Sequence, residues 1–290
     1  MTSMTTQARP TGICWQAHRG GGAHEAPDNT MAANRYAWKL GGIPEADIRT
    51  TKDGVIVCLH DETASRTTTA PAESKDKPIS ALTFEETRAW DAGIKFDAKF
   101  RGEKIPALEE AFSEMRGHPE RMMYLDLKDA NLVHLGRLID RYGVNGQLIF
   151  THHRQENCRE MKRIADGVRS MLWIGGNGEQ IRLKFEQALK TSFDGLDQVQ
   201  LHLNEKPERD EEWRYELEPD FLAYALREAS RCGVDLEVLP FAFDKLSIRN
   251  LLDLGIRWFA TDEPSRFLDG VRAWDRTYRF DDLLGKADGT

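Results

Sequence analysis

The sequence lacks the cysteine patterns that hold zinc clusters or disulfide frameworks together. Its 290 residues include only four cysteines, none of them in a CxxC pair. Zinc sites and disulfide-stapled domains need paired or regularly spaced cysteines, so both classes are disfavoured. We therefore expect reduced thiols, as is usual in the cytosol. The four residues are Cys14, Cys58, Cys158 and Cys232.

Long apolar runs are also missing. No stretch approaches the roughly 20 apolar residues that a membrane-spanning helix needs. Met1 to Pro10 are polar and no apolar segment follows them, so no secretory signal is expected. These absences predict a cytoplasmic protein without a membrane span.

An excess of basic residues, the usual mark of a nucleic-acid-binding protein, is absent. Forty basic residues stand against 48 acidic ones, which gives a net charge of −8. Binding a polyanion normally needs the opposite balance, so nucleic acid is not an expected partner. A small anionic substrate is compatible with this charge, because one local Arg, Lys or metal ion can dominate its own pocket. The composition indicates no particular oligomeric state.

What the sequence does contain is a regular alternation of short apolar runs with helical patterns. This alternation is typical of a parallel α/β fold. Eight main strands in a chain of 290 residues indicate a closed TIM (β/α)8 barrel. A doubly wound open sheet is the alternative, but no GxGxxG fingerprint opens the first predicted helix. The predicted strands are 13–17, 43–49, 122–127, 148–151, 170–174, 196–201, 234–239 and 257–260.

One region departs from this rhythm. Residues from about 62 to 104 are rich in Thr, Lys, Asp and Pro, and they follow a predicted hairpin strand at 55–59. A loop of this length inside a compact domain is usually functional or a small insertion. We therefore predict a single TIM-barrel domain over 1–290 with a small insertion at about 62–104, after the second strand.

Acidic side chains collect on the early strands, near the end where a parallel barrel places its active site. Glu45 and Asp47 lie two residues apart on one strand, so both side chains point to the same face. Asp126, on the next predicted barrel strand, can supply a third oxygen. Oxygen ligands favour one hard divalent ion, Mg²⁺ or Ca²⁺, over zinc. The alternative is a metal-free cluster neutralised by Arg19 and Lys128, because buried ion pairs of this kind occur.

Two histidines, His18 and His60, end predicted strands beside these acids. Imidazole suits proton transfer near neutral pH, and two of them facing one phosphorus atom would let one take a proton while the other gives one. The sequence does not assign the two roles. A lone histidine at a strand end is more often structural, but the joint placement beside acidic residues favours catalysis. Arg19 and Lys128 fit a clamp for an anionic substrate.

Later strand ends carry further candidates for the substrate pocket. His152 and Gln200 end strands and are expected to line the pocket wall. Trp173 and Phe243 are expected to form an apolar wall against the alcohol part of a substrate, although a core role suits both equally well.

Motifs in the first half of the chain resemble those of the glycerophosphodiester phosphodiesterase family. Each motif is common by itself, but their order and spacing together are highly specific. The close match covers residues from about 13 to 128, with a second short match near 261. The motifs are His18-Arg19-Gly20, Ala26-Pro27-Asp28-Asn29-Thr30, Glu45-Ala46-Asp47, Thr51-Lys52-Asp53-Gly54, His60-Asp61, Arg66-Thr67-Thr68, Ile105-Pro106-Ala107-Leu108-Glu109-Glu110 and Thr261-Asp262-Glu263-Pro264.

The resemblance implies a TIM barrel with an insertion after its second strand. It also implies metal-assisted cleavage of a glycerophosphodiester into sn-glycerol 3-phosphate and an alcohol. In this reading His18 and His60 are catalytic, Arg19 binds phosphate, and Glu45 and Asp47 bind the metal.

Two departures from the family pattern leave alternatives open. Asp126 stands beside Lys128 where the family usually has Glu, so ligation can be direct or through water. Residues 239–243 replace a sequence of the Trp-Thr-x-Asn type, which changes the expected leaving-group pocket. The alternatives are a phospholipase D-like or sugar-phosphodiester-cleaving relative, a cyclic phosphate product, or a barrel that binds its ligand without turnover.

Overall fold

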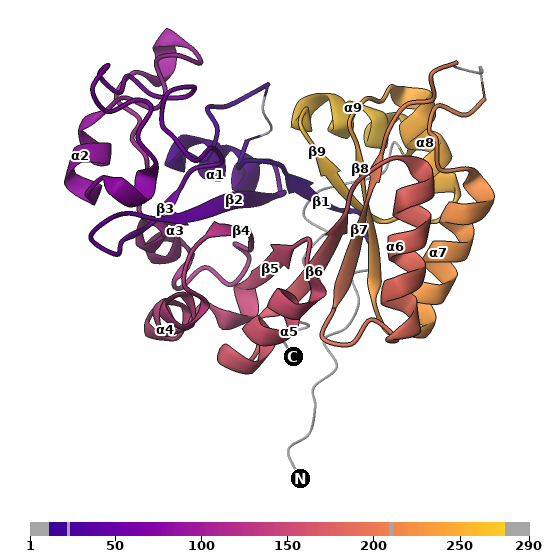
Figure 1. Cartoon of the computed structure of the whole chain (residues 1–290). Helices are drawn as coiled ribbons and strands as arrows, with labels where there is room; N and C mark the ends of the chain where they lie inside the picture. The colour runs from indigo at the N-terminus through magenta and orange to yellow at the C-terminus, as the bar shows by residue number, and fades with distance from the viewer. Residues whose placement is uncertain (1–11, 22–23, 209–211, 276–290) are drawn as a thin grey trace, which may run out of the picture.

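A computed structural model describes residues 12–21, 24–208 and 212–275 (Figure 1). Met1 to Pro10, for which the sequence predicts no secretory signal, lie outside the described residues. In the described part, no helix combines the length and the apolar character needed to cross a membrane.

Nine strands alternate with helices along the described chain. The strands are β1 (Cys14–Ala17), β2 (Ile43–Thr50), β3 (Ile56–Cys58), β4 (Met123–Asp129), β5 (Leu148–His152), β6 (Arg169–Ile174), β7 (Gln198–Leu203), β8 (Asp235–Pro240) and β9 (Trp258–Thr261). The helices are α1 (Met31–Lys39), α2 (Phe84–Ala89), α3 (Leu108–Met115), α4 (Leu132–Tyr142), α5 (Gln155–Ile164), α6 (Gly178–Lys190), α7 (Pro219–Arg231), α8 (Lys245–Asp253) and α9 (Pro264–Trp274), with short 3-10 turns η1 (Ile79–Ala81), η2 (Ala98–Phe100) and η3 (Asn145–Gln147).

Eight of the strands form a closed parallel barrel. They follow one another in the order β1-β9-β8-β7-β6-β5-β4-β2, and β1 also pairs with β2, which closes the ring. The short β3 pairs antiparallel with β2 outside the ring. This confirms the predicted TIM barrel and rejects the open sheet. The carboxyl ends of all eight strands therefore meet at one mouth.

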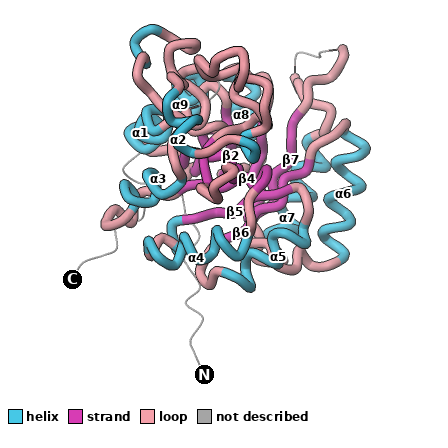
Figure 2. Tube along the Cα trace, turned by 60° about the vertical axis from the view of Figure 1, so that its left-hand side comes forward, coloured by secondary structure: helices cyan, strands magenta, loops and turns pink. Residues whose placement is uncertain are grey.

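The helices surround the barrel because their apolar faces need the outer faces of the strands (Figures 1 and 2). On β2, Ala46 and Ile48 belong to the large core cluster that joins strands and helices. Successive side chains of a strand point to opposite faces, so the alternate residues Glu45 and Asp47 point inward. Polar side chains begin several of the helices. For example, Thr30 accepts a hydrogen bond from the backbone of Ala33 at the start of α1.

The region predicted as an insertion adds no strand to the barrel. Residues 62–104 contain only η1, α2 and η2 as regular helical elements, and they form a separate lobe in Figure 1. The lobe has a small hydrophobic cluster of its own, which includes Ile79, Leu82 and Trp90. This cluster is joined to the barrel through Val57 on β3 and through Leu59. The lobe therefore holds the loop that follows β3, which carries His60, against the barrel.

Candidate active site

Three carboxylates meet at the mouth of the barrel. Glu45 and Asp47 are on β2, and the strand register sets Asp47 directly beside Asp126 on β4. One oxygen from each of the three lies within 4.8 Å of the others. The ammonium of Lys128 is the cation beside them, with Nζ 2.6 Å from Asp126 Oδ2 and 3.1 Å from Asp47 Oδ1. The ligand set expected from the sequence is therefore brought together.

The cluster has more negative charge than its protein neighbours compensate. Glu45 Oε2 accepts the backbone N–H of Arg19 at 2.6 Å, and Asp47 Oδ2 accepts Nδ2 of Asn29 at 2.7 Å. Glu45 Oε1, however, has no hydrogen-bond partner among the described residues, and Asp47 Oδ1 has only its ion pair with Lys128. Burial, together with the charge of Asp47, raises the pKa of Glu45 to about 8. Three adjacent buried acids, with an oxygen of Glu45 left without a donor, fit one hard divalent cation.

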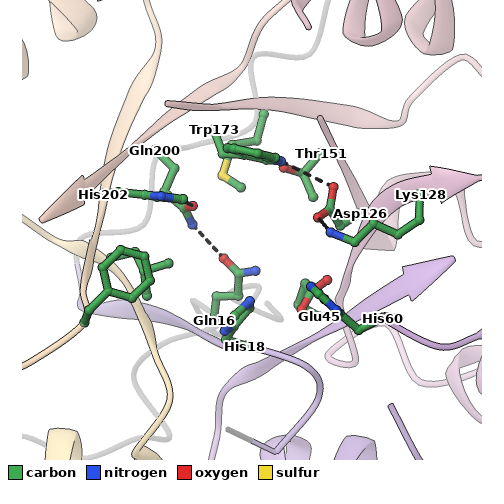
Figure 3. A pocket seen from close by; sticks show the side chains of 13 residues that line it. Gln16, His18, Glu45, His60, Asp126, Lys128, Thr151, Trp173, Gln200 and His202 are labelled. Carbon is green, nitrogen blue, oxygen red and sulfur yellow. Dashed lines mark hydrogen bonds and ion pairs between the residues drawn. The ribbon is translucent and has the colours of Figure 1, made fainter. Parts of the chain in front are cut away.

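His18 and His60 both line the cavity beside this cluster (Figure 3). In each histidine, Nδ1 is hydrogen-bonded to a carboxylate. His18 Nδ1 lies 2.8 Å from Asp262 Oδ1, and His60 Nδ1 lies 2.8 Å from Asp61 Oδ1. A carboxylate accepts only, so in the neutral imidazole Nδ1 carries the hydrogen and Nε2 is left as the basic atom. Both histidines are therefore prepared for proton transfer through Nε2.

The environment of His18 favours its protonated form in the metal-free protein. Burial works to lower the pKa of His18, but the hydrogen bond to Asp262 and the charges of Glu45 and Asp47 outweigh burial and raise it to about 9. A cation on the carboxylates would remove much of this effect, because it would cancel the charges that His18 faces.

A chain of ion pairs connects His60 to Arg19. Asp61, the partner of His60, also accepts a hydrogen bond from Nε of Arg66 at 2.6 Å. Arg66 and Arg19 both donate to Asp28 Oδ2, at 2.8 and 3.1 Å. The backbone of Arg19 has a positive φ of 57°, which aims its N–H at Glu45. The Arg19 side chain is thus engaged by Asp28 and is not among the residues that line the cavity.

The cavity joins the carboxylates and histidines to a neutral side made of amides and rings (Figure 3). Trp173 stacks on His202, with ring centroids 5.5 Å apart and planes within 6° of parallel. Phe241, 46 % exposed, meets His202 edge-on. The cavity is lined by Gln16, His18, Glu45, His60, Asp126, Lys128, Thr151, Met171, Trp173, Gln200, His202, Leu239 and Phe241.

The structure places most, but not all, of the expected pocket residues at this cavity. Lys128, Trp173 and Gln200 line it, whereas Asp47 is fully buried and does not line it. His152 does not line it, because on β5 the inward residue is Thr151. The ring of His152 instead accepts the backbone N–H of Arg154 at 3.0 Å, outside the cavity.

Phe243 corrects the sequence-based expectation for the apolar wall. Its side chain is 2 % exposed and belongs to the core, with the guanidinium of Arg266 over its ring. Phe241 lines the cavity in its place. The physical reason is that β8 ends at Pro240, so the alternation of a strand no longer sets the direction of the side chains that follow.

Other residues of the site were missed from the sequence. Gln16 lines the cavity, and its signal was available, because it lies on β1 two residues before His18. Asp262 follows β9, and only the three-dimensional pairing of β1 with β9 brings it to His18. Met171 and Leu239 also line the cavity, and both are apolar residues within apolar strands, which gives no local signal.

Solved structures similar to this chain share its architecture. The crystal structure of a glycerophosphodiester phosphodiesterase from Agrobacterium tumefaciens superposes with a TM-score of 0.70 at 21 % identity, covering 89 % of this chain and 99 % of that one. A phosphodiesterase from Oleispira antarctica, solved in complex with the product sn-glycerol-3-phosphate, gives 0.69 at 19 % identity, covering 90 % and 97 %. At these identities the likeness shows the fold.

Curated relatives match part of the chain. A glycerophosphodiester phosphodiesterase of Caldanaerobacter subterraneus is 37 % identical over 157 residues, which is 51 % of this chain and 61 % of that protein. Glycerophosphodiester phosphodiesterase 1 of Mus musculus is 42 % identical over 115 residues, or 39 % and 33 %. The matched stretches thus span about three fifths and one third of these relatives.

The model of the glycerophosphoryl diester phosphodiesterase family matches residues 18–266, which contain the three carboxylates, both histidines and Asp262. This chain therefore belongs to the glycerophosphoryl diester phosphodiesterase family.

Proposed function

We propose that this protein hydrolyses glycerophosphodiesters to sn-glycerol 3-phosphate and an alcohol, with one divalent metal ion and two histidines. The observation that carries the proposal is the arrangement around one cavity. Three carboxylates, with an orphaned oxygen on Glu45, lie beside two histidines, and each histidine has its Nδ1 held by a further acid. Family membership and the relatives named above support the same chemistry.

Glu45, Asp47 and Asp126 would hold the metal, for which Mg²⁺ and Ca²⁺ are the candidates given three oxygen ligands. When bound, the ion supplies positive charge to the phosphoryl oxygens as they become more negative in the transition state. Lys128, paired with two of the three acids, keeps a positive charge at the same wall of the cavity. Lys128 occupies Oδ2 of Asp126, so Asp126 would reach the ion through its other oxygen, Oδ1, directly or through water.

His18 and His60 would divide the proton transfers between them. Nε2 of one histidine takes a proton from the attacking water, and Nε2 of the other gives a proton to the departing alcohol oxygen. Asp262 and Asp61 hold the two rings in the tautomer that this division needs. Arg19 is proposed to bind phosphate after exchanging its contact with Asp28 for the substrate.

A panel of glycerophosphodiesters tests the proposal, assayed with and without Mg²⁺, Ca²⁺ and Mn²⁺ after treatment with EDTA. We expect EDTA to abolish release of sn-glycerol 3-phosphate and one of the metals to restore it. His18→Ala and His60→Ala should each lower kcat by roughly a hundredfold or more. Near-normal turnover by either purified variant contradicts the mechanism, and a ligand that stabilises the fold but is recovered unchanged indicates a binding protein.

The exposed ring of Phe241 favours a second candidate, in which the diester carries an apolar group, as the acylated glycerol of a lysophospholipid does. Phe241, Leu239 and Trp173 form a cavity side without charged groups, and an apolar group would be desolvated there at little cost. Phosphorus NMR of the products separates the possibilities. A lysophospholipid or sugar diester in the panel identifies the alcohol, and a cyclic phosphate has its own resonance.

A further inference from the structure

A buried acid lies beneath the cavity and takes no part in the chemistry described above. Glu237, on β8, is 0 % exposed and points into the barrel. Its Oε2 accepts hydrogen bonds from the Tyr124 hydroxyl at 2.8 Å and from Nε2 of Gln198 at 2.9 Å. Its Oε1 accepts one from Nε2 of Gln200. Both oxygens are thus satisfied by neutral donors, so Glu237 offers no vacant oxygen to a ligand.

The charge of Glu237 fixes the direction of the Gln200 amide. An ionised carboxylate can only accept, so the Gln200 atom that faces Glu237 must be Nε2. The second hydrogen of Nε2 is then given to Oε1 of Gln16 at 3.0 Å. Gln200 Oε1, on the other side, lies 3.2 Å from Nε2 of His202, which must therefore carry a hydrogen.

Gln16 is the last residue of this relay, the chain of hydrogen bonds that runs from Glu237 through Gln200. Because its Oε1 is occupied by Gln200, its Nε2 hydrogens are the ones left over, and no described residue accepts them. Figure 3 shows the Gln16 nitrogen turned toward the open centre of the cavity, next to His18. Apart from His18, the side chains on this side, such as Gln200 and Trp173, are uncharged, whereas Lys128 and the carboxylates form the opposite side.

We propose that Gln16 is a substrate-binding residue whose amide donates to a hydroxyl of the glycerol moiety, and that Glu237 is a positioning residue that sets this direction through Gln200. The inference rests on the proposed function for the identity of the ligand. A neutral donor suits a neutral hydroxyl, while the phosphoryl group belongs with the charged side. Loss of the carboxylate at position 237 would let the side-chain amide of Gln200 flip. Gln16 would then present its carbonyl oxygen, instead of its Nε2 hydrogens, to the cavity.

The test compares Gln16→Ala, Glu237→Gln and the double variant at pH 8 in the presence of Ca²⁺. Calorimetry measures binding of sn-glycerol 3-phosphate and, separately, of inorganic phosphate. We expect each single variant to weaken the binding of sn-glycerol 3-phosphate by about fivefold, which corresponds to one neutral hydrogen bond. The affinity for inorganic phosphate should be unchanged. The double variant should be no weaker than Gln16→Ala alone, because Glu237 acts through Gln16.

Tyr124→Phe is the matched control. It removes a hydrogen bond to the same carboxylate but leaves the contact between Glu237 and Gln200. It should lower thermal stability as Glu237→Gln does, yet bind sn-glycerol 3-phosphate like the wild type. Wild-type affinity in Gln16→Ala, independent effects of the two single variants, or an equal loss for inorganic phosphate would each overturn the proposal.

A second measurement needs neither a variant nor turnover. Nitrogen-15 NMR of the wild-type protein distinguishes the two neutral tautomers of His202, and the relay requires the hydrogen on Nε2. A hydrogen on Nδ1 would overturn the relay whether or not any ligand binds. If the wild type neither binds nor cleaves a glycerol phosphate, the proposed function fails, while the His202 spectrum still decides the orientation of the amides.

Discussion

The barrel contains two buried acidic sites that differ in how their oxygens are satisfied. At the mouth, one oxygen of Glu45 has no donor, and Asp47 Oδ1 has only the ammonium of Lys128 at 3.1 Å. Deeper in the barrel, Glu237 has donors on both oxygens. Burial raises the pKa of both glutamates, to about 8 for Glu45 and about 7 for Glu237.

The comparison teaches that a raised pKa alone does not identify a ligand site. Burial penalises any carboxylate, whatever its role. What distinguishes the mouth is that three acids repel one another and that one oxygen of Glu45 lacks a donor, so a cation would relieve a penalty there. At Glu237 the donors already do this, and the acid is left with an orienting role.

The largest expected difference between the two sites is in turnover. Glu45→Gln should lower kcat by at least about a hundredfold, because it removes a proposed ligand of the ion that would stabilise the transition state by several kcal/mol. Glu237→Gln should change kcat/KM by less than about tenfold, because only one neutral hydrogen bond to the substrate is affected. Steady-state kinetics with a saturating metal measure both. Comparable losses in the two variants would break the distinction between the sites.

The second largest expected difference between the two sites is in how much a bound metal stabilises the fold. With a metal at a hundred times its Kd, the free energy of unfolding of the wild type should rise by about 2.7 kcal/mol. Glu237→Gln should keep this increase and Glu45→Gln should lose most of it. Denaturant unfolding with EDTA or with Mg²⁺ or Ca²⁺ measures the effect. An increase retained by Glu45→Gln would mean that the ion binds elsewhere.

The third expectation concerns His18, which faces the acids at the mouth. In the metal-free protein its pKa should be about 9, against an ordinary value of 6.5. Since the folded pKa is raised, protonated His18 stabilises the fold fully below pH 6.5, and this contribution disappears as the pH rises through about 9. NMR titration measures the pKa directly.

Asp262→Asn supplies the control for this titration. It removes the hydrogen-bonding charge on Nδ1 of His18 and should lower the pKa. Addition of Ca²⁺ to the wild type should lower it as well, because the charges of Glu45 and Asp47 are then neutralised. A His18 pKa that ignores both changes would show that the acids at the mouth do not act on it.

The sequence was sufficient for the barrel and for the three acids at its mouth. The alternation of apolar runs with helical patterns predicted the eight strands, and the period of two on β2 predicted that Glu45 and Asp47 share a face. Adjacent residues of a strand point to opposite faces, so only one of Thr151 and His152 on β5 can point into the cavity, and it is Thr151.

The relay beneath the cavity could not be predicted in this way. Gln16, Gln200 and Glu237 come from β1, β7 and β8, and they meet only because the barrel is closed. The position of the Arg19 side chain could not be predicted either. It depends on the left-handed backbone conformation of Arg19 and on the hydrogen bond from its guanidinium to Asp28. Local patterns give the faces of elements, whereas these contacts depend on closure and on turn geometry.

The smallest expected effect tests the neutral side of the cavity, where Phe241 lines the cavity and Phe243, the residue expected there from the sequence, lies in the core. Phe241→Leu should raise KM for a diester with a bulky apolar alcohol by a few fold, because its exposed ring offers area to the alcohol. Phe243→Leu should leave KM unchanged and lower stability by about 1 kcal/mol, because its ring fills the core. Glycerophosphoethanolamine, whose alcohol is small and charged, is the matched substrate and should be insensitive to both. An increase in KM with Phe243→Leu alone would place the alcohol on the other side of β8.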